Sequence, residues 1–198
     1  MHFGRKSRRQ LNIERQDSGQ AEWVTGLFWV LILSILLCTQ LQISSWQTTG
    51  MYMEDALAAS NLASALIDLE EYGKSHKVRI SDPEEAYEVF LRAIRDNLQL
   101  DEEWECANKA LISGPVEIAD YIIYNVDQEQ VYADRVGSGG NVVETWSGKK
   151  GEINAPNGVL VECTGVYSEI EFPVEGFLGV TVLAHKGKLV DIAAERRE

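Results

Sequence analysis

The chain has 198 residues and a mass of 22.2 kDa, and its 18 Lys and Arg against 31 Asp and Glu give a net charge of −13. A nucleic-acid binder needs positive surface to neutralise phosphates, so this balance speaks against that class. Hydrophobic residues make up 45% of the chain, which is normal for a folded protein and argues against global disorder.

The charge is distributed unevenly along the chain. Residues 1–22 carry five basic and three acidic side chains, which sum to +2. Residues 23–53 carry no charge, whereas residues 54–198 carry 13 basic and 28 acidic side chains, which sum to −15. This pattern predicts a basic leader, an apolar segment and an acidic body rather than one soluble globule.

The apolar segment 23–43 has the length and composition of a transmembrane helix. As a helix it is about 31 Å long, enough to cross a bilayer core. Its hydroxyl groups can bond to helix carbonyls, and Trp23 and Trp46 suit the two membrane interfaces. Because the basic cluster precedes the segment, we expect a cytoplasmic N-terminus and an extracytoplasmic C-terminal domain.

Three alternatives to a retained span are less well supported. A cleaved signal peptide needs a small-residue site after its apolar core, and residues 37–40 (Leu-Cys-Thr-Gln) do not provide one. A lipoprotein would need small residues before its cysteine, but Leu36 and Leu37 precede Cys38. A buried core helix would have to hide 31 consecutive uncharged residues, which exceeds what a small globule usually buries.

Helical patterns follow the span. We predict one long helix over about residues 22–72 with a candidate bend at Gly50, an amphipathic second half and Gly73 as its C-cap. The apolar stripe of that second half is Leu62, Leu66 and Leu69.

A second amphipathic helix is predicted over about residues 83–98. It follows an extended link at 77–80 and starts with Ser81 as the cap, Pro83 in the first turn and Glu84 at the capping-box spacing. The acidic stretch 101–106 has no clear period, so a turn and one short helix both remain open.

From residue 111 onward, β-branched and aromatic residues dominate. The predicted strands are 116–126, 131–135, 142–146, one bent strand or two over 159–174, and a closing hairpin of 180–184 and 189–193 around a turn at 185–188. Another turn is predicted at 154–158, where Asn157-Gly158 tolerates positive φ. Helices followed by antiparallel strands predict an α+β fold. The predicted regions are a leader (1–22), a span (23–43), a helical region (44–110) and a β region (111–198).

A search for catalytic and metal-binding patterns finds none that is specific. The three histidines, His2, His76 and His185, lie in the leader or in predicted turns and lack zinc-type spacing. No nucleophile elbow, phosphate loop or dinucleotide loop occurs. A solvated acidic surface explains Glu102-Glu103 better than a cation site does. We therefore expect no enzyme activity, no metal and no cofactor.

The cysteines offer one candidate cross-link. Cys38 lies in the span and is expected to act as a small apolar filler. Cys106 and Cys163 lie in the extracytoplasmic part, where a disulfide could persist and would join the helical region to the sheet. Two thiols alone do not establish proximity, so free cysteines remain open as well.

Glu22 directly precedes the apolar segment and has two interpretations. It is an interfacial carboxylate favoured by the helix dipole, or it is an assembly contact. A carboxylate at membrane depth is costly unless it is paired, and the free α-amino group of a cleaved neighbour would pair with it.

A basic leader, Gly19, the pair Glu22-Trp23, an immediate apolar helix and an alanine-rich continuation over 54–65 are followed by the β region. This arrangement resembles type IV pilin-like proteins, and most of all the TadE-type minor pseudopilins of tight-adherence (Flp) pili. The resemblance implies cleavage after Gly19 by a prepilin peptidase, a mature start at Gln20, and an assembly contact at Glu22 and Trp23. In the family the glutamate is fifth after cleavage and its aromatic partner is Phe or Tyr, so an unprocessed membrane-anchored relative fits as well.

The predicted function is a membrane-anchored minor pilin, pseudopilin or assembly subunit of a surface pilus. Its expected partners are the membrane, other pilin-like subunits and a prepilin peptidase, and no nucleic acid. The alternative is a single-pass envelope protein with an extracytoplasmic ligand- or partner-binding domain. An enzyme ranks third, because no nucleophile, base and metal converge.

Overall fold

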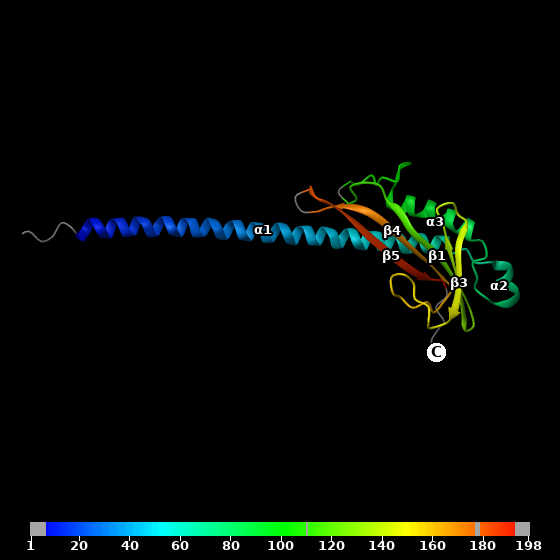
Figure 1. Ribbon diagram of the computed structural model, residues 1–198. Helices are drawn as coiled ribbons and strands as arrows, with labels where there is room; N and C mark the ends of the chain where they lie inside the picture. Colours follow the sequence, from blue (N-terminus) through cyan, green and yellow to red (C-terminus); the bar gives the residue numbers. More distant parts are fainter. Residues whose placement is uncertain (1–6, 110, 177–178, 193–198) are drawn as a thin grey trace, which may run out of the picture. The chain divides into compact units, whose positions relative to one another are not determined.

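The computed structural model describes residues 7–109, 111–176 and 179–192, with described side chains from Glu22 onward (Figure 1). Contacts divide the chain into two units, one ending at Ser45 and one beginning at Trp46. The elements are α1 (Ser7–Ser64), α2 (Leu69–Ser75), α3 (Pro83–Leu98), β1 (Glu117–Asp127), β2 (Gln130–Val136), β3 (Val142–Lys149), β4 (Gly165–Glu175) and β5 (Thr181–Asp191). A long apolar N-terminal helix, shorter helices and a C-terminal antiparallel sheet confirm the α+β prediction.

Helix α1 ends earlier than the sequence pattern predicted. It continues without a break past Gly50 but stops at Ser64, and Asp68 begins a new helix by accepting the N–H groups of Glu70 and Glu71 at 3.0 and 2.9 Å. Gly73 lies inside α2 and is not its C-cap. His76 takes the C-cap position with a φ of 55°, so a histidine in the predicted turn replaces the expected glycine.

Helix α3 occupies the predicted residues, Pro83–Leu98. Its N-cap is Asp82, whose carboxylate accepts the N–H of Glu85 at 2.9 Å, and not Ser81. Ser81 instead donates its hydroxyl to Asp68 at 3.1 Å. Aspartate caps at least as well as serine, so the adjacent residue takes the role. The predicted acidic stretch after α3 forms turns and an isolated bridge between Leu100 and Cys106, without a helix.

The five strands form one antiparallel sheet in the order β3-β2-β1-β4-β5 (Figure 1). The predicted hairpin of β1 and β2 and the predicted strand at β3 are confirmed. The predicted hairpin around 185–188 is wrong: β5 runs straight through these residues and pairs with β4 along its whole length, from Gly165↔Asp191 to Glu175↔Thr181. Residues 159–164 precede β4 and contribute only a bridge at Leu160.

Apolar side chains cover both faces of the sheet. On one face, the second half of α1 and α3 pack against alternate residues of β1 and β4, with Met53, Leu57, Phe90, Tyr121 and Ile170 fully buried. On the other face, a smaller cluster of Ile122, Tyr124, Val131, Ala133 and Tyr167 is covered by Ala155 and Val161 from the 150–164 segment. Burial on both faces explains why β1 shows an apolar run rather than alternation.

The buried stripe of α1 near its C-terminal end is polar. Ser60, Asn61 and Ser64 are fully buried, whereas the predicted apolar stripe is exposed. Leu62, Leu66 and Leu69 have exposed fractions of 60, 38 and 78%. The stripe prediction was wrong because the strands opposite this turn offer carbonyl and hydroxyl groups, which pair with the small polar side chains. Asn61, for example, donates to the carbonyl of Lys188 at 2.8 Å.

Candidate assembly surface on the N-terminal helix

The first half of α1 presents an apolar surface on all sides. From Trp23 to Ile43 nearly every described side chain is exposed, and the large ones, from Trp23 at 81% to Ile43 at 40%, are Trp, Leu, Phe, Val and Ile. Among the described residues, α1 is the one helix long and apolar enough to cross a membrane. A helix that is apolar all round belongs in a bilayer or a protein core. This half of α1 is therefore compatible with a membrane anchor.

Two hydroxyl groups of this segment are satisfied within the helix. Ser34 donates to the carbonyl of Val30, and Thr39 donates to the carbonyl of Ile35, both at 2.8 Å. These bonds confirm the predicted return of hydroxyls to the helix backbone. They lower the cost of placing the two residues in hydrocarbon, where water cannot replace a missing partner.

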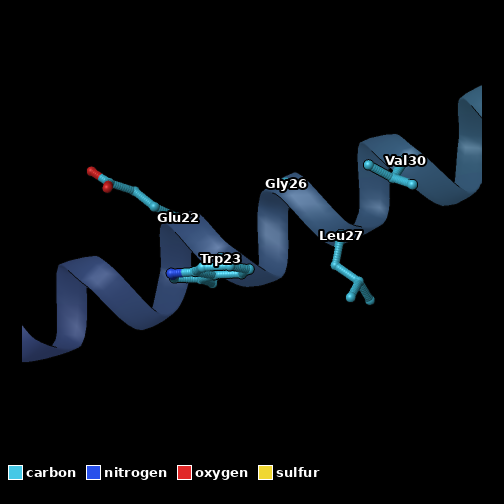
Figure 2. Close-up of a pocket in the computed structure, with 5 residues that line it drawn as sticks. All are labelled: Glu22, Trp23, Gly26, Leu27 and Val30. Atoms are coloured by element: carbon cyan, nitrogen blue, oxygen red, sulfur yellow. The ribbon is translucent and has the colours of Figure 1, made fainter.

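Glu22 and Trp23 do not face one another. Figure 2 shows the Glu22 side chain extending away from the helix while the Trp23 ring lies along another side of it, as expected for consecutive residues about 100° apart. Trp23 and Leu27, which are one turn apart, both border an open surface depression at Gly26. No atom lies within 4 Å of the position that a Cβ would take at Gly26.

The predicted cleavage site lies next to this surface in the sequence. Gly19 and Gln20 belong to α1 but precede Glu22, the first residue whose side chain is described. Processing after Gly19 and the assembly role of Glu22 and Trp23 therefore remain predictions.

The second half of α1 is tied to the edge strand β5 by charge. The Glu54 carboxylate lies 2.8 Å from the ammonium group of Lys186 and 2.7 Å from that of Lys188. Hydrogen bonds from Lys186 and then Lys188 lower the pKa of Glu54 to about 2, so it stays ionised at neutral pH. Glu54 is the first charge after the uncharged run, a sequence signal that marks this residue but not its partners.

The candidate disulfide between Cys106 and Cys163 is not formed, and both thiols are free. The two cysteines lie at opposite ends of β1. Glu105, beside Cys106, bridges to Pro115 just before β1, whereas Thr164, beside Cys163, accepts the N–H of Val126 at 2.9 Å near its end. Eleven extended residues separate these points by roughly 30 Å. A disulfide requires Cα atoms within about 7 Å, so it would demand a different fold.

A histidine of the head lies close to two carboxylates. His185 lies 3.3 Å from a Glu171 oxygen and 3.8 Å from a Glu169 oxygen on the sheet surface. Within the part of the chain that the structure describes, no group of three His, Cys, Asp or Glu side chains is placed to hold a metal ion.

No family model, curated protein or solved structure matches the chain.

Proposed function

We propose that the chain is a membrane-anchored minor pilin, pseudopilin or assembly subunit of a tight-adherence or type IV-like surface apparatus. The observation that carries the proposal is the division of α1 into two halves. Residues 23–43 are uncharged and exposed, while the following turns are packed into an α+β head through Met53 and Leu57. Such a helix can leave lipid and enter a bundle of similar helices without any change in the head.

Transfer of the apolar half of α1 from lipid into a helix bundle needs contacts that lipid does not provide. Lipid tails are as apolar as leucine, so helices associate in membranes through close packing and polar pairs. The open surface depression at Gly26 allows a close approach, and the Glu22 carboxylate supplies one partner of a polar pair. A neighbour's α-amino group, released by cleavage after Gly19, would be the other partner.

The charge distribution supports an N-in orientation for this subunit. The leader carries five basic residues, whereas no Lys or Arg follows the span before Lys74, so the positive-inside rule keeps the leader in the cytoplasm and exports the head. A prepilin peptidase acting on the cytoplasmic side would then reach Gly19. The head would act by lateral contacts rather than by catalysis.

The processing step is tested by mass spectrometry of the N-terminus of the native protein. A mature chain that begins at Gln20 is the expected result. An intact chain beginning at Met1 would favour the alternative, a single-pass envelope protein whose head binds a ligand or partner. A start beyond Ile43 would contradict both the pilin-like subunit and the single-pass envelope protein, because the released head would have no anchor.

The assembly role of Glu22 is tested by Glu22→Gln, which removes the charge and keeps the shape. We expect normal membrane insertion and a normally folded head, but at least a tenfold loss of the subunit from sheared surface fibres. That loss corresponds to about 1.4 kcal/mol or more, well within the effect of breaking an ion pair in a dry environment. The matched control is Glu129→Gln on the exposed β1–β2 turn, which should leave incorporation unchanged. Equal incorporation of both variants would reduce Glu22 to an interfacial residue.

A further inference from the structure

Where the head begins, at Trp46, exposed apolar side chains from α1 lie together with others from the start of β5. Trp46, Val180, Val182 and Leu183 have exposed fractions of 42, 61, 48 and 56%. Trp46 begins the head on α1, and the other three residues belong to β5 or directly precede it. The segment 180–184 carries no charge, and Glu175, the last residue of β4, is the charged residue nearest the described hairpin end.

The hairpin is fixed to Trp46. The indole Nε1 donates to the backbone carbonyl of Glu175 at 3.2 Å. An open groove of about 330 Å³, lined by residues that include Trp46, Val174, Val182 and Leu183, lies between α1 and the strand ends. These contacts make the hairpin end and the first turn of α1 in the head one surface.

The chain itself limits how far this surface can lie from the apolar segment. Trp46 is the third residue after Ile43, so even a fully extended connection spans at most about 10 Å, and a helical one about 4.5 Å. If residues 23–43 cross the bilayer, Trp46 and the hairpin end bonded to it lie at the interface whatever the orientation of the head.

The boundary between uncharged and charged residues is at a similar depth on both elements. On α1 the first charge is Glu54, eight residues after Trp46, a rise of about 12 Å. On β5 the first lysine is Lys186, four residues after Val182, a rise of about 13 Å. Glu54 and Lys186 meet in an ion pair. These rises slightly exceed the 5–10 Å that interfacial elements bury, so Glu54 and Lys186 stay above the buried depth, while Glu175, paired with Thr181, lies at the level of the headgroups.

We propose that this surface, composed of Trp46, Val180, Val182 and Leu183, docks into the headgroup region of the bilayer. The proposal rests on the membrane-anchoring part of the function proposed above. Its occupant is lipid, because the covalent distance to the span places lipid there before any protein partner arrives. Trp46 has the expected chemistry for the interface, with an apolar ring and an N–H that is already bonded. The docked hairpin is a second attachment to the membrane, in addition to the span, and it fixes the tilt of the head.

The test measures the depth of single fluorescent labels in the full-length chain. Bimane is attached to Val180→Cys, with Leu183→Cys as a second variant, in a background in which Cys38, Cys106 and Cys163 are alanine. Each chain is reconstituted alone in a phosphatidylcholine–phosphatidylglycerol nanodisc containing lipid with a doxyl quencher near the headgroup or deep in the tail. Leu36→Cys reports on the span, and Glu129→Cys reports on the turn at the opposite end of the sheet. Near-UV circular dichroism checks that each head is folded.

The expected result is strong quenching of the Val180 and Leu183 labels by the shallow quencher, at least threefold above the Glu129 label. The Leu36 label should be quenched best by the deep quencher. Quenching at Leu36 with Val180 and Leu183 labels equal to Glu129 would overturn the docking proposal and leave the anchor intact. No quenching at Leu36 would overturn the anchor and the docking together. Labels protected only when chains are crowded would assign the surface to a second copy, which also overturns lipid docking.

Discussion

Buried polar side chains on α1 fix how this helix lies on the sheet. Asn61 donates to the carbonyl of Lys188 at 2.8 Å, and its own oxygen accepts the Ser168 hydroxyl at 2.7 Å. Three residues further on, Ser64 accepts the hydroxyl of Tyr121 at 2.9 Å. Leucines at these positions would tolerate several registers, whereas each of these bonds is made in one register only. The polar stripe therefore fixes one register of α1 on the sheet, whereas an apolar stripe would only hold the helix against it.

Replacing Asn61 with alanine should lower the stability of the head markedly. The change leaves the buried Ser168 hydroxyl and the Lys188 carbonyl without their partner, which costs about 2–3 kcal/mol. For a domain of this size we expect a fall in Tm of roughly 5–10 °C, measured by circular dichroism of the full chain in detergent micelles. Leu62→Ala, one residue along on the exposed side, is the control and should stay within about 0.5 kcal/mol. Equal effects of the two changes would contradict the role of the polar stripe.

Glu54 should make the stability of the head depend on acid pH. Its pKa falls from an ordinary 4.5 to about 2 in the folded chain, because Lys186 and Lys188 hold the carboxylate. The stabilisation is therefore present above pH 4.5 and is lost as the pH falls towards 2. Since the side chain is about one third exposed, we expect only about 1 kcal/mol from Glu54→Gln at pH 7.

The measurement compares Tm at pH 7 and at pH 2.5 for the wild-type chain and Glu54→Gln. The difference between them should shrink at the lower pH, because Glu54 is then protonated in the unfolded wild-type chain and partly protonated in the folded one. Glu70→Gln removes an exposed partner of Lys74 and serves as the control, with no expected change at either pH. A Glu54 difference that persists at low pH would point to packing rather than charge.

At the scale of elements, β5 is a single edge strand whose middle contains Lys186-Gly187-Lys188. Lysines are common on edge strands, where they discourage pairing with other chains. Tyr167 leaves no room for a side chain at residue 187. A Cβ on Gly187 would lie 2.2 Å from the hydroxyl oxygen and 2.9 Å from the Cζ of Tyr167. The buried Tyr167 ring thus covers the glycine, so a turn-like tripeptide is accommodated inside a strand.

Gly187→Ala should therefore destabilise the sheet. Tyr167 is almost fully buried and donates to Glu169 at 2.7 Å, so its ring cannot move away freely. We expect a cost of about 1–3 kcal/mol, seen as a lower Tm and faster amide exchange in β5. Gly73→Ala in α2, where no atom lies within 4 Å of the new Cβ, is the control and should be neutral or stabilising. A neutral Gly187→Ala would mean that the ring adjusts.

The sequence patterns predicted elements well where local chemistry alone determines them. The bounds of α3 follow from the helical spacing of its apolar residues and from Pro83. The β1–β2 hairpin follows from the short turn between its two strands. The patterns failed to predict that α1 ends at Ser64 and that β5 continues through Gly187, because residues distant in the sequence determine both. For the candidate site, the patterns identified the exposed apolar helix, while the role of Glu22 stays a prediction. They missed the Glu54 pair with Lys186 and Lys188, because more than 130 residues separate its members.

At the scale of the whole chain, α1 belongs to two environments. Its first half has no described contact that buries it, whereas its second half supplies Met53, Ala56 and Leu57 to the core. Along the chain, the first unit ends at Ser45 and the second begins at Trp46. The charge pattern changes close by, from an uncharged run to an acidic head. The head therefore needs part of the helix for its own core, while the exposed apolar half is compatible with a membrane anchor.

This division predicts where the chain can be cut. A fragment of residues 46–198 retains the core residues of α1 and should give a near-UV circular dichroism spectrum and a cooperative thermal transition. A fragment of residues 65–198 loses Met53, Leu57 and Asn61. Truncating a buried Met or Leu costs 2–5 kcal/mol each, so the combined loss approaches the whole 5–15 kcal/mol that stabilises a typical domain. This fragment should be unfolded or molten, and a cooperative transition in it would show that the sheet and α3 need no support from α1.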